Sequence, residues 1–127
     1  MDENQRVPLS DVEWRIMHTL WTHGDMSLGE ILREVADTGW SKQSLTSFLK
    51  RLEAKEAIRR DTRWRPSRYA ARITQDAAVN SETQAVLEKV YGGNPVLMVT
   101  SAVKSGKLSD QDIQSLINLL QKGGDEP

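Results

Sequence analysis

The side chains best suited to chemistry in this chain are basic, and they gather in one segment, residues 40–72. That segment holds ten Lys or Arg against three Asp or Glu, although the 127-residue chain as a whole has a net charge of −1. Residues 1–39 carry a net charge of −5, and residues 73–127 carry −3. Because such clustered positive charge attracts a polyanion, the segment predicts contact with nucleic acid.

One part of the basic segment is predicted to be a helix that Ser41 caps. Its apolar residues recur at helical spacing from Leu45 to Leu52, and polar residues follow the same rhythm on the opposite face. Amide and hydroxyl side chains can read base edges in the major groove, whereas Lys and Arg suit phosphates or guanine. Alone, such a face could equally be an ordinary solvated one. The predicted DNA-binding residues of this helix are Lys42, Gln43, Ser44, Thr46, Ser47, Lys50 and Arg51.

The residues after this helix predict a strand, a basic turn and a second strand. The turn contains Pro66, which suits a hairpin tip because no ladder N–H is needed there. A basic hairpin directly after a groove-sized helix is typical of the wing of a winged helix-turn-helix, although a solvated loop is the alternative. Trp40 is expected to begin a short strand of the wing sheet, and Trp64 to touch sugar or phosphate. The predicted wing contacts are Arg59, Arg60, Arg63, Arg65 and Arg68.

Two further helices are predicted before the basic segment. Ser10 and Ser27 each begin the S-x-x-E pattern of a capping box, and each is followed by an apolar stripe at helical spacing. The first helix is expected to end near Gly24 and the second by Gly39. Trp14 and Trp21 are expected to pack against this first helix's neighbours.

Beyond residue 73 the pattern becomes wholly helical. Thr74 can cap one helix, Pro95 suits the first position of another, and Ser109 can cap the last. Three short helices with apolar faces scarcely make a core alone, so a second subunit is expected to complete it. A helical cap folded back on the N-terminal domain is the alternative. The predicted dimerisation residues are Val86, Val90, Tyr91, Leu97, Ile113, Leu116, Ile117 and Leu120.

The predicted fold class is therefore mainly α with a small β-wing. Residues 1–73 are expected to form a winged-helix DNA-binding domain and residues 74–122 a helical dimerisation region, with a disordered acidic tail at 123–127. The apolar stretches are too short to cross a bilayer, and the N-terminus lacks the basic and apolar run of a signal peptide. A cytoplasmic location is expected.

No catalytic, metal or cofactor site is predicted. The chain has no Cys and lacks the H-E-x-x-H and G-x-S-x-G patterns. His18 and His23 are poorly spaced for a shared metal, and Ser105-Gly-Lys107 is not a phosphate loop. Asp110 and Asp112 simply favour the positive end of a helix dipole. The chain is thus not expected to be an enzyme.

The chain resembles the BlaI/MecI-type penicillinase repressors, a group that includes the CopY-type copper repressors. The resemblance covers nearly the whole chain. It rests on Ser10-x-x-Glu-Trp14, on Ser44-Leu-Thr-Ser-Phe-Leu-Lys-Arg-Leu52 followed by Lys55-x-x-Ile58, on Val90-Tyr-Gly-Gly93 and on Lys107-Leu-Ser-Asp-Gln-Asp-Ile113. It implies a homodimeric winged-helix repressor of palindromic operators that often control β-lactamase or cell-envelope genes.

The resemblance also implies a release signal for some members. A BlaR/MecR-type membrane sensor protease leads to cleavage at an Asn-Phe bond in the dimerisation region, and alignment places that bond at Ser101-Ala102 here. Because neither residue matches, the usual cleavage signature is absent. The copper branch depends on a Cys-x-Cys pair that this chain lacks. A winged-helix module for RNA or protein partners is the alternative function.

Overall fold

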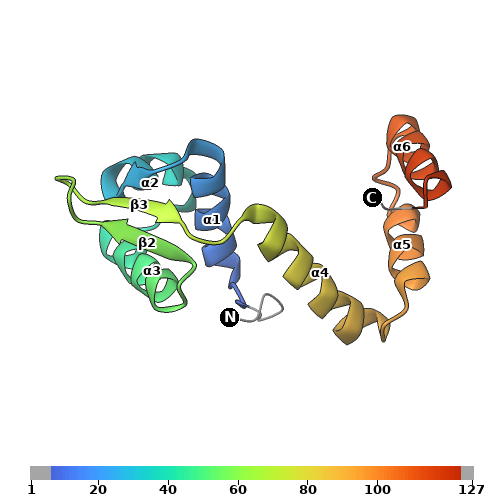
Figure 1. Cartoon of the computed structure of the whole chain (residues 1–127). Helices are drawn as coiled ribbons and strands as arrows, with labels where there is room; N and C mark the ends of the chain where they lie inside the picture. The colour runs from blue at the N-terminus through green and yellow to red at the C-terminus, as the bar shows by residue number, and fades with distance from the viewer. Residues whose placement is uncertain (1–6, 124–127) are drawn as a thin grey trace. The chain divides into compact units, whose positions relative to one another are not determined.

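The computed structural model describes residues 7–123, and the chain divides into two compact units at Thr83 and Gln84. The first unit holds α1, α2, α3, the small sheet and the start of α4, and the second holds the rest of α4 with α5 and α6; these helices are labelled in Figure 1. The N-terminal residues that bear on a signal peptide, and the predicted tail except Gly123, lie outside the described residues.

Helix α1 spans Asp11–His23 and begins where the sequence predicts. The Ser10 hydroxyl accepts the Glu13 amide at 3.3 Å, and the Glu13 carboxylate accepts the Ser10 amide at 2.9 Å, so the capping box is complete. The helix ends at Gly24, whose φ of 83° favours glycine.

Helix α2, Leu28–Glu34, has a second complete capping box, formed by Ser27 and Glu30. A single 3-10 turn, η1 (Ala36–Thr38), follows and ends at Gly39 with φ 76°. The Arg15 guanidinium of α1 donates hydrogen bonds to both carboxylate oxygens of Asp37 in this turn, at 2.7 and 2.9 Å. This fork-to-fork pair ties α1 to the turn that leads into the next helix.

Helix α3, Lys42–Ala54, has Ser41 as its N-cap, with the Ser41 hydroxyl accepting the Ser44 amide at 3.0 Å. Leu45, Leu49 and Leu52 are fully buried. The apolar face predicted from the sequence is therefore the face that α3 turns to the core.

The sheet has three antiparallel strands in the order β1-β3-β2: Met26–Ser27, Arg68–Ala71 and Ile58–Asp61. Ile58 lies opposite Ala71, and Met26 lies opposite Tyr69. The prediction that Trp40 begins a strand was wrong. The third strand is β1, and Trp40 instead packs edge-on against Phe48 of α3, with ring centroids 5.1 Å apart. A two-residue strand has too little periodicity to be recognised from sequence.

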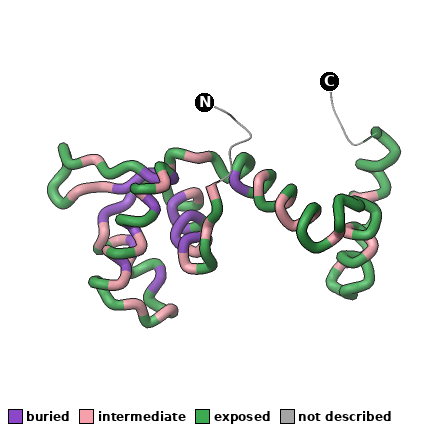
Figure 2. Tube along the Cα trace, turned by 90° about the horizontal axis from the view of Figure 1, so that it is seen from below, coloured by how far each residue is buried: buried purple, intermediate pink, exposed green. Residues whose placement is uncertain are grey.

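The core of the first unit lies between α1, α2, α3 and the sheet. Ile16, Met17 and Ile31 have no exposed surface, and Ile58 has 1%. Figure 2 shows the buried residues gathered in this unit, whereas α5 and α6 carry only exposed and intermediate residues. Helix-turn-helix packing of α2 and α3 beside a β2–β3 hairpin is a winged helix, so the predicted fold class is confirmed.

Helices α4 (Gln75–Tyr91), α5 (Pro95–Lys104) and α6 (Asp110–Gln121) follow. Thr74, Asn94 and Ser109 accept amides at their respective N-termini, and Pro95 is the first residue of α5. None of the residues in α5 or α6 is buried.

Candidate nucleic-acid interface

The outer face of α3 carries most of the predicted DNA-reading residues. Lys42, Gln43, Ser47, Lys50 and Arg51 are exposed. Gln43, Ser47 and Lys50 are spaced at i, i+4 and i+7, so they project from one side of the helix while the leucines fill the other. The structure thus leaves a polar strip on a helix of the size that a major groove admits.

Three predicted α3 contacts have local partners in the free protein. The Thr46 hydroxyl donates to the Lys42 carbonyl at 2.8 Å, and the Ser44 hydroxyl accepts from the Ser41 hydroxyl at 3.1 Å. The Arg51 guanidinium lies 5.5 Å from the centre of the Phe48 ring. Thr46 and Ser44 are half-buried, so each offers less polar surface than Gln43.

The hairpin between β2 and β3 brings the predicted wing residues together. Arg59, Arg60, Arg63 and Arg65 are exposed, and Pro66 follows a cis Arg65–Pro66 peptide in the turn. Within residues 7–123, no carboxylate lies at ion-pair distance from Arg59, Arg60 or Arg65. Among the described residues, these three guanidinium groups therefore remain available to bind an anion of another molecule.

Asp61 organises the entry to the wing turn. Its carboxylate accepts the Arg63 guanidinium at 2.8 and 3.0 Å and the Arg63 backbone amide at 3.0 Å. These hydrogen bonds from Arg63 hold the pKa of the Asp61 carboxyl down at about 2. Asp61 thus stays charged at any ordinary pH and partly offsets the positive charge of the wing.

Arg68 differs from the other wing arginines because its side chain is mostly covered. Its guanidinium donates to the Asp25 carbonyl at 2.6 Å, lies 3.5 Å from the Glu30 carboxylate and sits 5.5 Å from the centre of the Trp64 ring. The Trp64 side chain itself is 57% exposed at the wing. No sequence signal links these residues, because Arg68 and its hydrogen-bond partner are 43 residues apart.

A buried ion pair fixes the far end of α3. The Lys55 ammonium, just after α3, donates to the Glu13 carboxylate at 2.5 Å and to the Pro8 carbonyl at 2.8 Å. The Glu13 side chain is 1% exposed. Burial pushes the pKa of Glu13 upward, but the hydrogen bonds from Lys55 and the Ser10 amide outweigh it, so the pKa is lowered. The pair holds the C-terminal end of α3 against the start of α1.

The predicted dimerisation residues are largely solvent-accessible in the single chain. Val90 and Leu120 are 61% and 71% exposed, and the other six are exposed or half-buried. The predicted cleavage residues, Ser101 and Ala102, are both exposed within α5.

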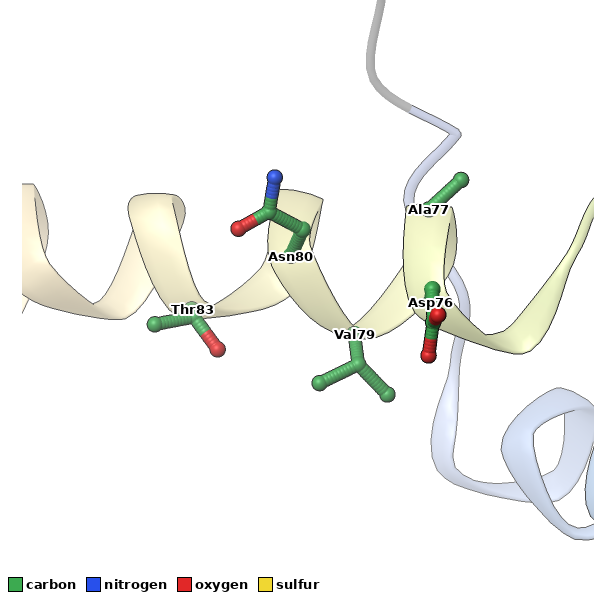
Figure 3. A pocket seen from close by; sticks show the side chains of 5 residues that line it. All are labelled: Asp76, Ala77, Val79, Asn80 and Thr83. Carbon is green, nitrogen blue, oxygen red and sulfur yellow. The ribbon is translucent and has the colours of Figure 1, made fainter. Parts of the chain in front are cut away.

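Two recesses in the described surface lie away from the polar strip of α3. One, in Figure 3, is an open recess along α4, lined by Asp76, Ala77, Val79, Asn80 and Thr83. The other surrounds the paired side chains of Glu30 and Arg68. Within residues 7–123, no three His, Asp or Glu side chains converge as metal ligands do. None of the helices there is long and apolar enough to span a membrane.

Comparison with known proteins places these features in a family. Residues 9–122 match the family model described as penicillinase repressor. The penicillinase repressor of Bacillus licheniformis is 25% identical over 120 residues, which cover 93% of this chain and 94% of that protein. The penicillinase repressor of Staphylococcus aureus is 27% identical over 118 residues, 92% and 94% of the two chains.

A third relative is the methicillin resistance regulatory protein MecI of Staphylococcus aureus strain N315, 25% identical over 94% of this chain and 98% of its own. The match runs through the winged helix and the later helices alike, and confirms the resemblance seen in the sequence. The chain belongs to the penicillinase repressor family, whose members are transcriptional regulators and not enzymes.

Proposed function

We propose that this protein is a homodimeric repressor that binds palindromic operator DNA, with α3 in the major groove and the β2–β3 wing on the adjoining backbone. The observation that carries this proposal is the exposed polar strip of α3 beside a wing with three arginines that lack a carboxylate partner in residues 7–123. β-Lactamase or cell-envelope genes, and the protein's own operon, are its expected targets. Such a protein acts in the bacterial cytoplasm, where the chromosome lies.

Within the reading helix, Gln43 is the residue best placed to distinguish bases. Its amide is exposed near the N-terminus of α3, the end that a helix-turn-helix protein directs at base edges. Gln pairs through two hydrogen bonds with adenine N6 and N7. With its hydroxyl bonded to Lys42, Thr46 would offer its methyl group to a thymine methyl. Lys42, Ser47, Lys50 and Arg51 would contact phosphates or neighbouring bases.

The experiment that tests DNA binding is footprinting of the full chain on the DNA upstream of its own gene, with competitor DNA at two salt concentrations. Protection of a dyad-symmetric site that survives competitor is expected. Weak, unlocalised binding that salt erases would refute the repressor and favour a module for RNA or protein partners.

Single substitutions then distinguish residues that recognise particular bases from residues that contribute only positive charge. Gln43→Ala and Thr46→Ala are expected to relax preference at particular base pairs, whereas Arg65→Ala should weaken binding to all sequences alike. Each lost base contact corresponds to about 1–3 kcal/mol of discrimination. If selectivity is unchanged in both α3 variants, α3 is not the reading helix.

The dimer is proposed from the apolar surface of α5 and α6. Val96, Leu97, Met98 and Val99 are consecutive apolar residues, so α5 is apolar nearly all round. A helix of this kind requires burial, yet three of these four are 48–71% exposed in the single chain. We propose that a second copy covers them and sets two α3 helices on half-sites about one or more helical turns apart.

The release signal is proposed to be proteolysis by a sensor protease of the BlaR/MecR type. Ser101 and Ala102 are exposed, but they lie inside α5, where the Ser101 and Ala102 carbonyls accept bonds from Ser105. Cutting would therefore require α5 to unwind locally. Mass spectrometry of the protein from induced cells tests this: a new terminus at Ala102 is expected, and an intact chain after derepression would refute it.

A further inference from the structure

We propose that Arg68 is a positioning residue of the wing, which fixes Trp64 and the hairpin turn against β1 and α2 and does not itself neutralise a DNA phosphate. This inference rests on the proposed DNA-binding function. It assigns Arg68 a role different from that of Arg59, Arg60 and Arg65, although all four are arginines of the same hairpin.

The first argument is the number of groups that already engage the guanidinium. The Asp25 carbonyl takes one N–H at 2.6 Å, and the Glu30 carboxylate lies 3.5 Å from the other terminal nitrogen. The Arg68 side chain is 28% exposed, compared with 87% for Arg63. A phosphate would have to displace a carboxylate and a carbonyl to bind Arg68, whereas it could approach Arg65 directly.

The second argument is that the partners of Arg68 belong to different elements. Asp25 precedes β1, Glu30 lies in the first turn of α2, and Trp64 is in the wing turn. The Glu30 oxygen that faces Arg68 also accepts the Ser27 amide at 2.9 Å in the capping box. Arg68 therefore joins the start of α2 to the wing turn, while Glu30 remains held by its own cap.

The third argument is the position of Trp64. A two-stranded hairpin bends easily beyond its last cross-strand pair, which here is Asp61 and Arg68. Trp64 lies beyond that pair, and the flat Arg68 guanidinium is its neighbour at 5.5 Å. A ring that is 57% exposed but supported from one side is suited to contact a sugar or phosphate edge. Arg68 thus acts on DNA through Trp64.

The geometry is tested first without DNA, from the NMR signal of the Trp64 indole N–H in the full chain, assigned with Trp64→Phe. Arg68→Ala and Arg68→Lys are both expected to shift this signal towards that of a free indole. Lys keeps the positive charge, but its ammonium lacks the planar face and the paired N–H donors of a guanidinium. Glu30→Gln should shift it in the same direction, since Gln keeps the cap acceptor but not the charge. Arg59→Ala, at an exposed arginine of β2 that is five residues from Trp64, is the matched control and should leave it unchanged.

Operator binding by fluorescence anisotropy over a salt series then separates the two roles. Arg65→Ala is expected to reduce the salt slope by roughly 0.9 for each protomer that loses a phosphate contact. Arg68→Lys, which keeps the charge, should weaken binding about threefold to tenfold, as Arg68→Ala does. Glu30→Gln should also weaken binding, and its effect should not add to that of Arg68→Ala.

The opposite pattern overturns the proposal. If Arg68 is a phosphate ligand, Arg68→Lys retains near-normal affinity, and Glu30→Gln strengthens binding by freeing the guanidinium. An unchanged Trp64 signal in Arg68→Ala also overturns it, whatever the DNA result. If the unaltered protein binds no operator, the proposed function fails together with this role, while the Trp64 signal still reports separately whether the contact exists.

Discussion

Replacement of Lys55 by Met tests how far the fold depends on its one deeply buried carboxylate among the described residues. Met keeps most of the apolar stem of Lys but removes the ammonium that meets Glu13 at 2.5 Å. The Glu13 side chain is 1% exposed, and its second oxygen, Oε2, has no hydrogen-bond partner among the described residues. Lys55→Met therefore leaves a buried negative charge with only its cap contacts.

The expected loss of unfolding free energy is about 2 kcal/mol at pH 7. Breaking a fully buried pair on one side costs about 3–5 kcal/mol, and the value is reduced here because the Lys55 side chain is 32% exposed. In the unaltered protein the lowered pKa of Glu13 stabilises the fold above pH 4.5, and this stabilisation is lost as the pH falls through the folded-state pKa. In Lys55→Met the Lys55 ammonium no longer opposes the effect of burial, so the pKa of Glu13 is expected to rise. Protonation of Glu13 at low pH then removes the buried charge and recovers part of the lost stability.

Urea unfolding of the full chain at pH 7 and pH 4 measures both effects. The difference between Lys55→Met and the unaltered protein should shrink at pH 4, and Glu13→Gln in the same chain should restore much of the stability at pH 7. Lys50→Met is the control, because Lys50 is an exposed lysine of α3. A loss below about 0.5 kcal/mol at pH 7, the size of an ordinary surface change, would refute the reasoning, as would an equal loss at both pH values.

Three shorter predictions concern the cap of α3, the core and the proposed dimer. Ser41→Ala removes the N-cap of α3 and should cost about 1 kcal/mol of unfolding free energy by urea denaturation; an unchanged midpoint would mean that the cap does not stabilise the helix. Leu49→Ala empties a site with no exposed surface and should cost about 2–5 kcal/mol, whereas a loss below 1 kcal/mol would show that the core closes around the gap. The double variant Leu116→Glu with Ile117→Glu should lose both the dimer and tight operator binding. Sizing with light scattering measures the dimer, and fluorescence anisotropy measures operator binding. Ser115→Glu, on the opposite side of α6, is its control, and dimers retained in the double variant would refute the proposed interface.

Much of the local structure follows from the sequence because its signals are short-range. A capping box spans four residues, and a helical apolar stripe repeats within two turns, so Ser10, Ser27 and Ser41 mark their helices without knowledge of the fold. The basic hairpin was predicted for the same reason. The family followed from motifs whose order extends along nearly the whole chain.

Features that join distant segments could be found only in the folded chain. Strand β1 is two residues long and is defined by its pairing with β3, so neither its existence nor the true place of Trp40 beside Phe48 could be read locally. Among the predicted contacts, Gln43 and Arg65 face solvent, whereas Ser44 and Arg68 are engaged within the protein. A count of charges along the sequence treats all arginines alike, because it does not show which of them contact other groups in the folded chain.

The sequence by itself determined the helices, their caps, the basic character of residues 40–72 and the family. These depend on residue type and on spacing along one chain. Tertiary structure decided which charges are available: it placed Asp25 and Glu30 beside Arg68 and Glu13 beside Lys55, across 38 to 43 residues of sequence. The free energy of a charge is set by what surrounds it in space, and only the packed fold supplies those surroundings.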